Sequence, residues 1–108
     1  MKQLTKKRYV YFIRAVDSPD GRIKIGCSYK PIRRLLALAA WSSYPLEVIA
    51  VAPGDFSTER SLHDFFAADR LHSEWFRSSP ELLGVIEDMS RGVPLYLALS
   101  NATMARAA

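Results

Sequence analysis

The sequence predicts a small α+β domain in which a three-stranded antiparallel sheet is flanked by helices, in the order β-β-α-β-α-α. Its 108 residues allow one domain and one hydrophobic core. Near the N-terminus, two stretches rich in apolar residues surround a turn that contains proline and glycine, which is typical of a β-hairpin. Further along, apolar residues recur at helical spacing behind residues that commonly begin helices.

The hairpin is predicted first. Residues 8–16 are rich in aromatic and β-branched side chains, which favour a strand. Residues 17–21, Asp-Ser-Pro-Asp-Gly, predict a turn, because proline presets φ and glycine accepts a positive φ. Residues 22–27 alternate polar and apolar side chains and predict the second strand. With a suitable register, Tyr11 and Lys24 lie on the same face of this hairpin.

A helix over residues 31–40 and a third strand follow. Proline suits the first turn of a helix, and Ser28 is a candidate cap nearby. The third strand covers residues 46–52 and ends at a Pro-Gly pair. The helix is expected to turn an apolar face inward that consists of Leu35, Leu36 and Leu38.

The C-terminal half predicts two further helical segments. Asp55 or Ser57 can cap a helix over residues 57–69. Residues 79–81, Ser-Pro-Glu, begin another helix, and residues 95–99 add a last turn or two. We expect Trp75 and Phe76, between these helices, to form an apolar anchor after a loop. The chain is thereby divided into a basic tail (1–7), a single domain (8–99) and a C-terminal tail (100–108).

The positive charge is concentrated in one part of the chain. Net charge is +4, with ten of the fifteen Lys and Arg in residues 1–34 against two acids, which makes that segment +8 and the remainder −4. A basic segment of this kind favours a polyanionic partner. The candidate nucleic-acid-binding residues are Lys6, Lys7, Arg8, Arg14, Arg22, Lys30 and Arg33.

Other classes of protein are disfavoured. No apolar run approaches the roughly 18 residues of a membrane span, and no signal peptide is recognisable, so we expect a cytoplasmic protein without a membrane partner. Cys27 is the only cysteine, so no internal disulfide can form. Cys27 is most simply a small apolar residue beside the sheet. A metal site of Cys27, His63 and His72 has unsuitable spacing, and the sequence gives His72 no role.

Five polar side chains suit phosphodiester hydrolysis: Tyr11, Lys24, Arg34, Glu59 and His63. A carboxylate can hold Mg²⁺, a guanidinium can clamp a phosphate, and a phenol or amine can relay a proton. Each residue also has an ordinary structural reading. Tyr11 can be a packed strand aromatic, Glu59 can stabilise a helix N-terminus, and His63 can be a histidine at the edge of the core.

The order and spacing of several short motifs carry a family resemblance. Tyr9-Val10-Tyr11 precedes Lys24-Ile25-Gly26 by twelve residues, and Arg34 follows Gly26 by eight. Glu59-x-x-x-His63 and Glu74-Trp75-Phe76 come later. Together, over residues 8–78, they resemble the GIY-YIG nuclease superfamily, and in particular its phage-type branch, known from meiotically up-regulated gene products.

The resemblance implies a small antiparallel sheet flanked by helices and a metal-dependent endonuclease. By position, Tyr11 would activate or orient the attacking water, Arg34 would contact the scissile phosphate, and Glu59 would bind a single Mg²⁺ or Mn²⁺ ion. Lys24 replaces the usual second tyrosine, and either it or His63 would assist the reaction. Tyr9 stands where the first motif usually has glycine, and the asparagine common near the end of the family's motifs has no clear counterpart.

The predicted function is therefore a Mg²⁺-dependent endonuclease that acts on DNA and comes from a phage, prophage or mobile element. Two alternatives stay open: a nuclease-like module that binds nucleic acid without cutting it, and a protein-interaction domain. The sequence leaves open whether RNA is a partner, which target is chosen and how many copies assemble.

Overall fold

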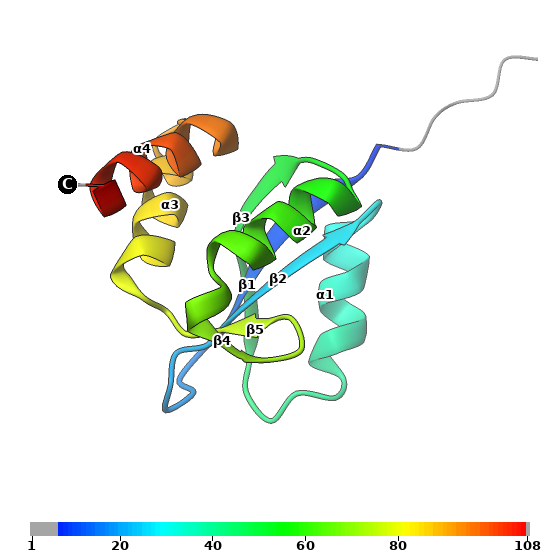
Figure 1. Cartoon of the computed structure of the whole chain (residues 1–108). Helices are drawn as coiled ribbons and strands as arrows, with labels where there is room; N and C mark the ends of the chain where they lie inside the picture. Colours follow the sequence, from blue (N-terminus) through cyan, green and yellow to red (C-terminus); the bar gives the residue numbers. More distant parts are fainter. Residues whose placement is uncertain (1–6, 108) are drawn as a thin grey trace, which may run out of the picture.

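The computed structural model describes residues 7–107, which form one sheet and the helices that cover it (Figure 1). The elements, in chain order, are β1 (Tyr9–Ala15), β2 (Ile23–Ser28), α1 (Pro31–Ala39), β3 (Leu46–Pro53), α2 (Phe56–Phe65), a 3₁₀ turn η1 (Ala67–Asp69), β4 (Arg70–His72), β5 (Trp75–Phe76), α3 (Pro80–Ser90) and α4 (Leu95–Ala107).

The sheet has five strands in the order β3-β1-β2-β5-β4, and its neighbouring strands are antiparallel. The α+β class is as predicted, but the expected sheet of three strands was too small. The two additional strands are β4, with three residues, and β5, with two. Segments this short show no alternation that sequence inspection can detect. The Trp75–Phe76 anchor is therefore a strand, paired with Ile23 and Lys24 of β2.

The register of the β1–β2 hairpin sets the geometry of the polar face. Tyr11 lies opposite Gly26, and Ile13 lies opposite Lys24. Lys24 is therefore on the same face as Tyr11, as predicted, but diagonal to it and not directly across. In the hairpin loop, Asp17 and Gly21 both have positive φ values, 63° and 57°.

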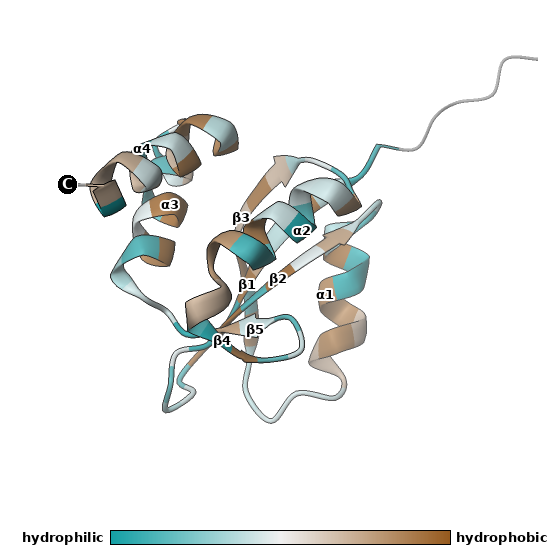
Figure 2. Cartoon of the chain, viewed as in Figure 1, coloured by the Kyte–Doolittle hydropathy of each residue, from teal (hydrophilic) through white to brown (hydrophobic). Residues whose placement is uncertain are grey.

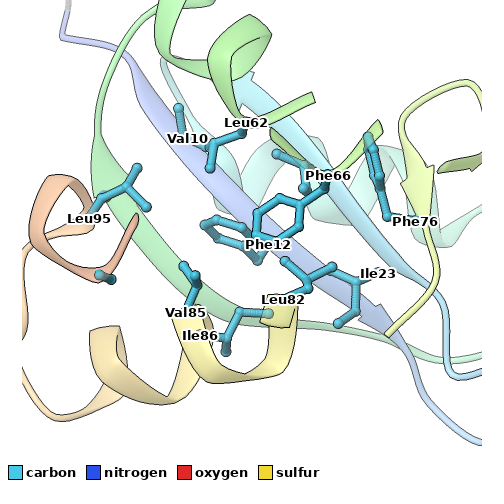
Figure 3. Packing of buried hydrophobic residues seen from close by; sticks show 13 residues of the cluster. Val10, Phe12, Ile23, Leu62, Phe66, Phe76, Leu82, Val85, Ile86 and Leu95 are labelled. Carbon is cyan, nitrogen blue, oxygen red and sulfur yellow. The ribbon is translucent and has the colours of Figure 1, made fainter. Parts of the chain in front are cut away.

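The main hydrophobic core lies on the face of the sheet that α2, α3 and α4 cover (Figure 3). Alternate residues of β1 and β2 point into it, together with buried side chains of the three helices. Its labelled members in Figure 3 are Val10, Phe12, Ile23, Leu62, Phe66, Phe76, Leu82, Val85, Ile86 and Leu95. Burial of this apolar surface fixes α2 against the sheet.

Helix α1 packs on the opposite face and buries little of itself. Leu35 and Leu38 are half-buried, but Leu36 is 67% exposed, so the prediction that Leu36 faces inward was wrong. No residue of α1 is fully buried. Figure 2 shows apolar residues continuing around the C-terminal part of α1, where Leu36 lies. The helix is amphipathic in sequence, but its apolar stripe is wider than the surface that it covers.

The C-terminus is helical beyond the point expected. Residues 100–107, expected as a tail, continue α4 to Ala107. Arg106 forms an ion pair with Glu81 of α3 at 3.1 Å, and its guanidinium lies 3.7 Å from the ring centroid of Phe65. These contacts hold the last turn of α4 against α3 and α2. None of the described helices has the length and apolar character that a membrane span requires.

Candidate active site

A cavity of about 360 Å³ brings together residues from distant parts of the sequence. Tyr11 of β1, Arg34 of α1 and Glu59 of α2 all line it, and so does Glu74, which immediately precedes β5. Four separate segments thus supply a phenol, a guanidinium and two carboxylates to one space. Three of the five residues that the sequence singled out for catalysis line this cavity directly.

Beside the cavity, Glu59, His63 and Glu74 form a cluster in which one ligand atom from each residue lies within 4.8 Å of the others. Glu59 and His63 are one turn apart on α2 and share a face. The helix is capped by Asp55, whose carboxylate accepts hydrogen bonds from the amides of Ser57 and Thr58. This cap fixes the first turn, from which Glu59 projects.

Ile25 anchors two members of this cluster through its backbone. Strand β5 pairs with β2 only up to Lys24. At Ile25 the amide donates to the carbonyl of Glu74 at 3.0 Å, and the carbonyl accepts from Nε2 of His63 at 2.9 Å. The imidazole also packs against the Phe76 ring, with centroids 5.1 Å apart. Because a carbonyl oxygen only accepts, Nε2 donates its hydrogen in this bond, and Nδ1 is the ring nitrogen that the bond leaves unused.

Lys24 joins the site through Glu74. Its ammonium nitrogen lies 2.9 Å from Oε1 of Glu74 and 5.7 Å from the ring centroid of Trp75. The residue is only 6% exposed, although lysine is usually a solvated strand residue. The ion pair compensates the buried ammonium and holds the Glu74 carboxylate at the cluster.

Two groups of the site, the carboxyl of Glu59 and the phenol of Tyr11, have raised pKa values. Burial raises the pKa of Glu59, and the negative charge of Glu74 raises it further, while His63 and Lys24 oppose the shift. Burial likewise raises the pKa of Tyr11, and the Arg34 guanidinium beside it acts in the opposite direction. Tyr11 is therefore a protonated phenol at neutral pH.

The basic residues predicted to bind nucleic acid fall into two groups. At the cavity rim, the guanidinium of Arg8 lies 4.2 Å from the ring centroid of Tyr29 and 4.7 Å from that of Phe56. Lys30 and Arg33 line a second cavity of about 430 Å³, of which Arg34 is also a wall. These residues form a basic surface continuous with the active-site cavity.

The remaining basic candidates lie elsewhere. Arg14 forms an ion pair with Glu47 of β3 at 3.9 Å and lines neither cavity. Arg22 pairs with Asp20 at 3.1 Å. The ammonium of Lys7 lies 5.7 Å from the Tyr9 ring centroid. Lys6 lies outside the described residues.

The candidates chosen from the sequence omit one residue of the site, Glu74. Glu74 belongs to the cluster, and the signal that could have found it was its place in the Glu74-Trp75-Phe76 motif. Cys27 lines the cavity, but neither it nor His72 joins the cluster found among residues 7–107. The Sγ atom of Cys27 contacts the Gly54 carbonyl at 3.8 Å, and burial raises the pKa of this thiol, which disfavours the reactive thiolate.

The fold and the site define a small α+β domain that carries a carboxylate–imidazole cluster beside a phenol and a guanidinium. Residues 8–91 match the model of the T5orf172 domain, and the chain therefore belongs to the T5orf172 domain family. This phage-associated family stands in the context of GIY-YIG-like and HNH-like endonucleases, and the match does not distinguish between these two types. No curated protein and no solved structure matched the chain.

Proposed function

We propose that the chain is a divalent-metal-dependent endonuclease of the GIY-YIG type that hydrolyses phosphodiester bonds in DNA. The observation that carries the proposal is the convergence of Tyr11, Arg34 and Glu59 on one cavity, next to His63 and Glu74. These residues are spread over 64 positions of the sequence, from Tyr11 to Glu74. Their convergence favours a common chemical role over five separate structural ones.

The donor set fits a divalent cation. Two carboxylates and one imidazole nitrogen suit Mn²⁺, and the carboxylate oxygens suit Mg²⁺. Glu59 would be the principal ligand, with Glu74 and the His63 imidazole beside it. Histidines that bind a metal usually donate a hydrogen bond from their other ring nitrogen, which fixes the orientation of the ring. The hydrogen bond from His63 to the Ile25 carbonyl is of this kind. The metal would supply stabilisation of the negative charge that develops on the phosphate.

Arg34 and the basic surface around it would hold the substrate. The guanidinium of Arg34 lines both cavities, so it can contact the scissile phosphate from the active-site side. Lys30 and Arg33 would then bind the next phosphates along the strand, and Arg8 would bind at the rim. Contacts of this kind provide affinity and orientation without choosing a base sequence.

Tyr11 would orient the attacking water through its hydroxyl group. Because its pKa is raised, Tyr11 does not act as a resident phenolate base at neutral pH. The water oxygen forms the new bond to phosphorus as the bond to the leaving deoxyribose oxygen breaks. The attacking water loses one proton and the leaving oxygen gains one, so the protons balance. Lys24, held by Glu74 on the same face, adds positive charge near this exchange.

A nucleic-acid-binding module without cleavage is the second candidate function. The 2.9 Å ion pair between Lys24 and Glu74 favours it, because Glu74 already has a cation as its partner. This candidate keeps the basic surface and the cavity but assigns no reaction to them. It predicts salt-sensitive binding that does not depend on Glu59, and no cutting with any divalent metal.

Plasmid nicking separates the two candidates. Wild-type protein and Glu59→Ala are incubated with supercoiled DNA in the presence of Mg²⁺, Mn²⁺ or a chelator, and a parallel set uses RNA. The endonuclease proposal expects metal-dependent nicking by the wild type alone. Binding at low salt by both proteins, with no nicking by either, would instead support the binding module. Nicking that survives in Glu59→Ala would remove Glu59 from the reaction.

A further inference from the structure

A cavity lined by aromatic residues lies between the end of α1 and the β4–β5 hairpin. It is separate from the active-site cavity lined by Tyr11, Arg34 and Glu59, which we also call the catalytic cavity. The aromatic-lined cavity has a volume of about 330 Å³, and its walls include Trp41, Tyr44 and Trp75, together with Arg22, Ser42 and Ser43. We call this set the tryptophan pocket. Its three aromatic residues come from two segments more than thirty positions apart in the sequence.

Trp41 is the most informative member of the pocket, because its side chain is 92% exposed. A single exposed aromatic residue on a protein surface is ordinary. Here, however, the exposed ring shares a cavity with a second tryptophan and a tyrosine, both half-buried. Trp41 contributes little to the core, and its large π-face is available to a ligand.

The loop that carries Trp41 and Tyr44 is held in place by its own hydrogen bonds. The Trp41 amide donates to the Leu38 carbonyl at 3.1 Å, which ties the backbone of Trp41 to the end of α1. The Ser42 hydroxyl donates to the Tyr44 carbonyl at 2.6 Å and accepts from the Tyr44 amide at 3.1 Å. A preorganised loop loses less conformational freedom when a ligand binds.

The lining of the pocket indicates the chemistry of that ligand. Aromatic faces bind a flat, aromatic group by stacking, and serine hydroxyls can form hydrogen bonds to its polar edge. Arg22 is the one charged residue among those that line the pocket, and its Nε is fixed by Asp20 at 3.1 Å. The base of a nucleotide, which is planar with polar edges and is joined through its sugar to a phosphate, matches this lining.

The position of the pocket relative to the catalytic cavity supports the same ligand. Trp75 immediately follows Glu74 of the cluster and lies 5.7 Å from the Lys24 ammonium. On the other wall, Trp41 lies just past the C-terminal end of α1, the helix whose Arg34 lines the catalytic cavity. The helix rises about 8 Å from Arg34 to its last residue, Ala39, which is roughly the length of two stacked nucleotides. One nucleic-acid strand could therefore contact both sites.

We propose that the tryptophan pocket binds a nucleobase of a single-stranded or unpaired segment, near the phosphate that occupies the catalytic cavity. This inference rests on the proposed function for its nucleic-acid partner, but not on cleavage. Bases inside a duplex cannot reach such a pocket without leaving the stack, so the pocket favours a strand that is already unpaired or distorted.

The test measures binding of the full chain, in chelator, to a labelled single-stranded oligonucleotide, to the matching duplex and to a mononucleotide. Trp41→Ala is expected to weaken single-strand binding about 5- to 100-fold, the effect usual for loss of one base–aromatic stack. Trp41→Phe should restore most of the affinity. Tyr96→Ala is the matched control, because Tyr96 is 76% exposed on α4 and does not line the pocket.

Two further readouts distinguish stacking from charge. Trp41→Ala should leave the salt dependence of binding unchanged, because an indole releases no counterions. In a Trp75→Phe background, Trp41 fluorescence should be quenched by the oligonucleotide more strongly than by the mononucleotide. Equal quenching by both would identify a free-nucleotide site and overturn the polynucleotide assignment.

Wild-type affinity in Trp41→Ala, an equal loss in Tyr96→Ala, or absence of any nucleic-acid binding would overturn the inference. The experiments distinguish failure of the pocket assignment from failure of the endonuclease proposal. If Glu59→Ala abolishes nicking while Trp41→Ala binds normally, only the pocket assignment fails. If Trp41 is needed for binding while the wild type never nicks DNA, only the endonuclease fails.

Discussion

The ring of Tyr11 on β1 lies directly over Gly26, its partner residue on β2. A methyl group at position 26 would contact the hydroxyl and Cζ of Tyr11 and would lie 2.7 Å from Cε1, closer than side-chain carbons approach one another. Glycine is therefore required here by the close approach of the tyrosine ring. Because Gly26 has no side chain, the Tyr11 phenol can lie against the backbone of β2.

Gly26→Ala is expected to displace the Tyr11 ring and reduce nicking about 100-fold, since a shift near 1 Å at a reacting group has an effect of this size. Overpacking should also lower the free energy of unfolding by about 1–3 kcal/mol. Nicking rate and urea denaturation measure the two effects. Nucleic-acid binding in chelator should be unchanged, because the basic surface is intact.

The control for this substitution is Gly84→Ala in α3, where an added Cβ meets nothing within 4 Å. Gly84 lies inside a helix, so alanine should raise the free energy of unfolding by about 0.5–1 kcal/mol and leave nicking unchanged. Equal behaviour of the two variants would contradict the role assigned to Gly26.

Phe66 supports the site from the core. It is fully buried at the end of α2, the helix that carries Glu59 and His63. Phe66→Ala should lower the free energy of unfolding by about 3–5 kcal/mol, because it removes a large buried ring and leaves a cavity. Chemical denaturation checks this value. Leu83→Ala, at a 45% exposed position, should change the free energy by less than about 0.5 kcal/mol.

The cap of α2 gives the stability a pH dependence. Hydrogen bonds from the Ser57 hydroxyl and the Thr58 amide lower the pKa of Asp55 from its ordinary value of 3.8. A lowered folded-state pKa means that the stabilisation is complete above pH 3.8 and is lost as the pH falls through the folded value. Melting temperature should therefore be lower for Asp55→Ala than for the wild type at pH 7, and the gap should narrow below pH 4.

Asp55→Asn separates the cap from the charge, because asparagine caps helices without titrating in this range. Its melting temperature should lie close to that of the wild type at pH 7. A gap between the wild type and Asp55→Ala that stays constant from pH 7 to pH 3 would contradict the assignment to the carboxylate.

Arg33 and Arg14 provide a paired test of the basic surface. Arg33 lines the second cavity beside Arg34, whereas Arg14 is paired with Glu47 and lines neither cavity of the site. If Arg33 contacts one phosphate, Arg33→Ala should reduce the slope of log affinity against log salt by about 0.9. Arg14→Ala should leave that slope unchanged. Titrations over a series of salt concentrations measure both, and a reversed pattern would place the nucleic acid on another face.

The elements that sequence could predict are those with a long or strongly marked signal. The first strand of the hairpin is rich in aromatic and β-branched residues, the second alternates, and the turn between them contains proline and glycine. Helix α3 is capped by Ser79, whose side chain accepts from the Leu82 amide. Strands β4 and β5 have too few residues to alternate, and their pairing depends on β2, which is distant in sequence. Leu36 was misassigned because amphipathic spacing predicts a face but not how far a partner covers it.

The same distinction holds for the site. Tyr11, Arg34, Glu59 and His63 could be selected from residue type and spacing, but their convergence depends on tertiary packing. Glu74 lies beside them because the Ile25 amide donates to its carbonyl, next to the β2–β5 pairing, and because Lys24 pairs with its carboxylate. No local pattern of the sequence encodes these contacts.

The central claim is that Glu59 holds a divalent cation with which the site cuts DNA. The most direct test is single-turnover nicking of supercoiled plasmid over a series of Mn²⁺ concentrations, with wild type, Glu59→Gln and Glu47→Gln. Glu47 is the matched control, because it pairs with Arg14 and does not join the cluster. We predict saturable, metal-dependent nicking by the wild type and Glu47→Gln, and a rate at least about 100-fold lower for Glu59→Gln. Equal rates for wild type and Glu59→Gln at every concentration would contradict the claim.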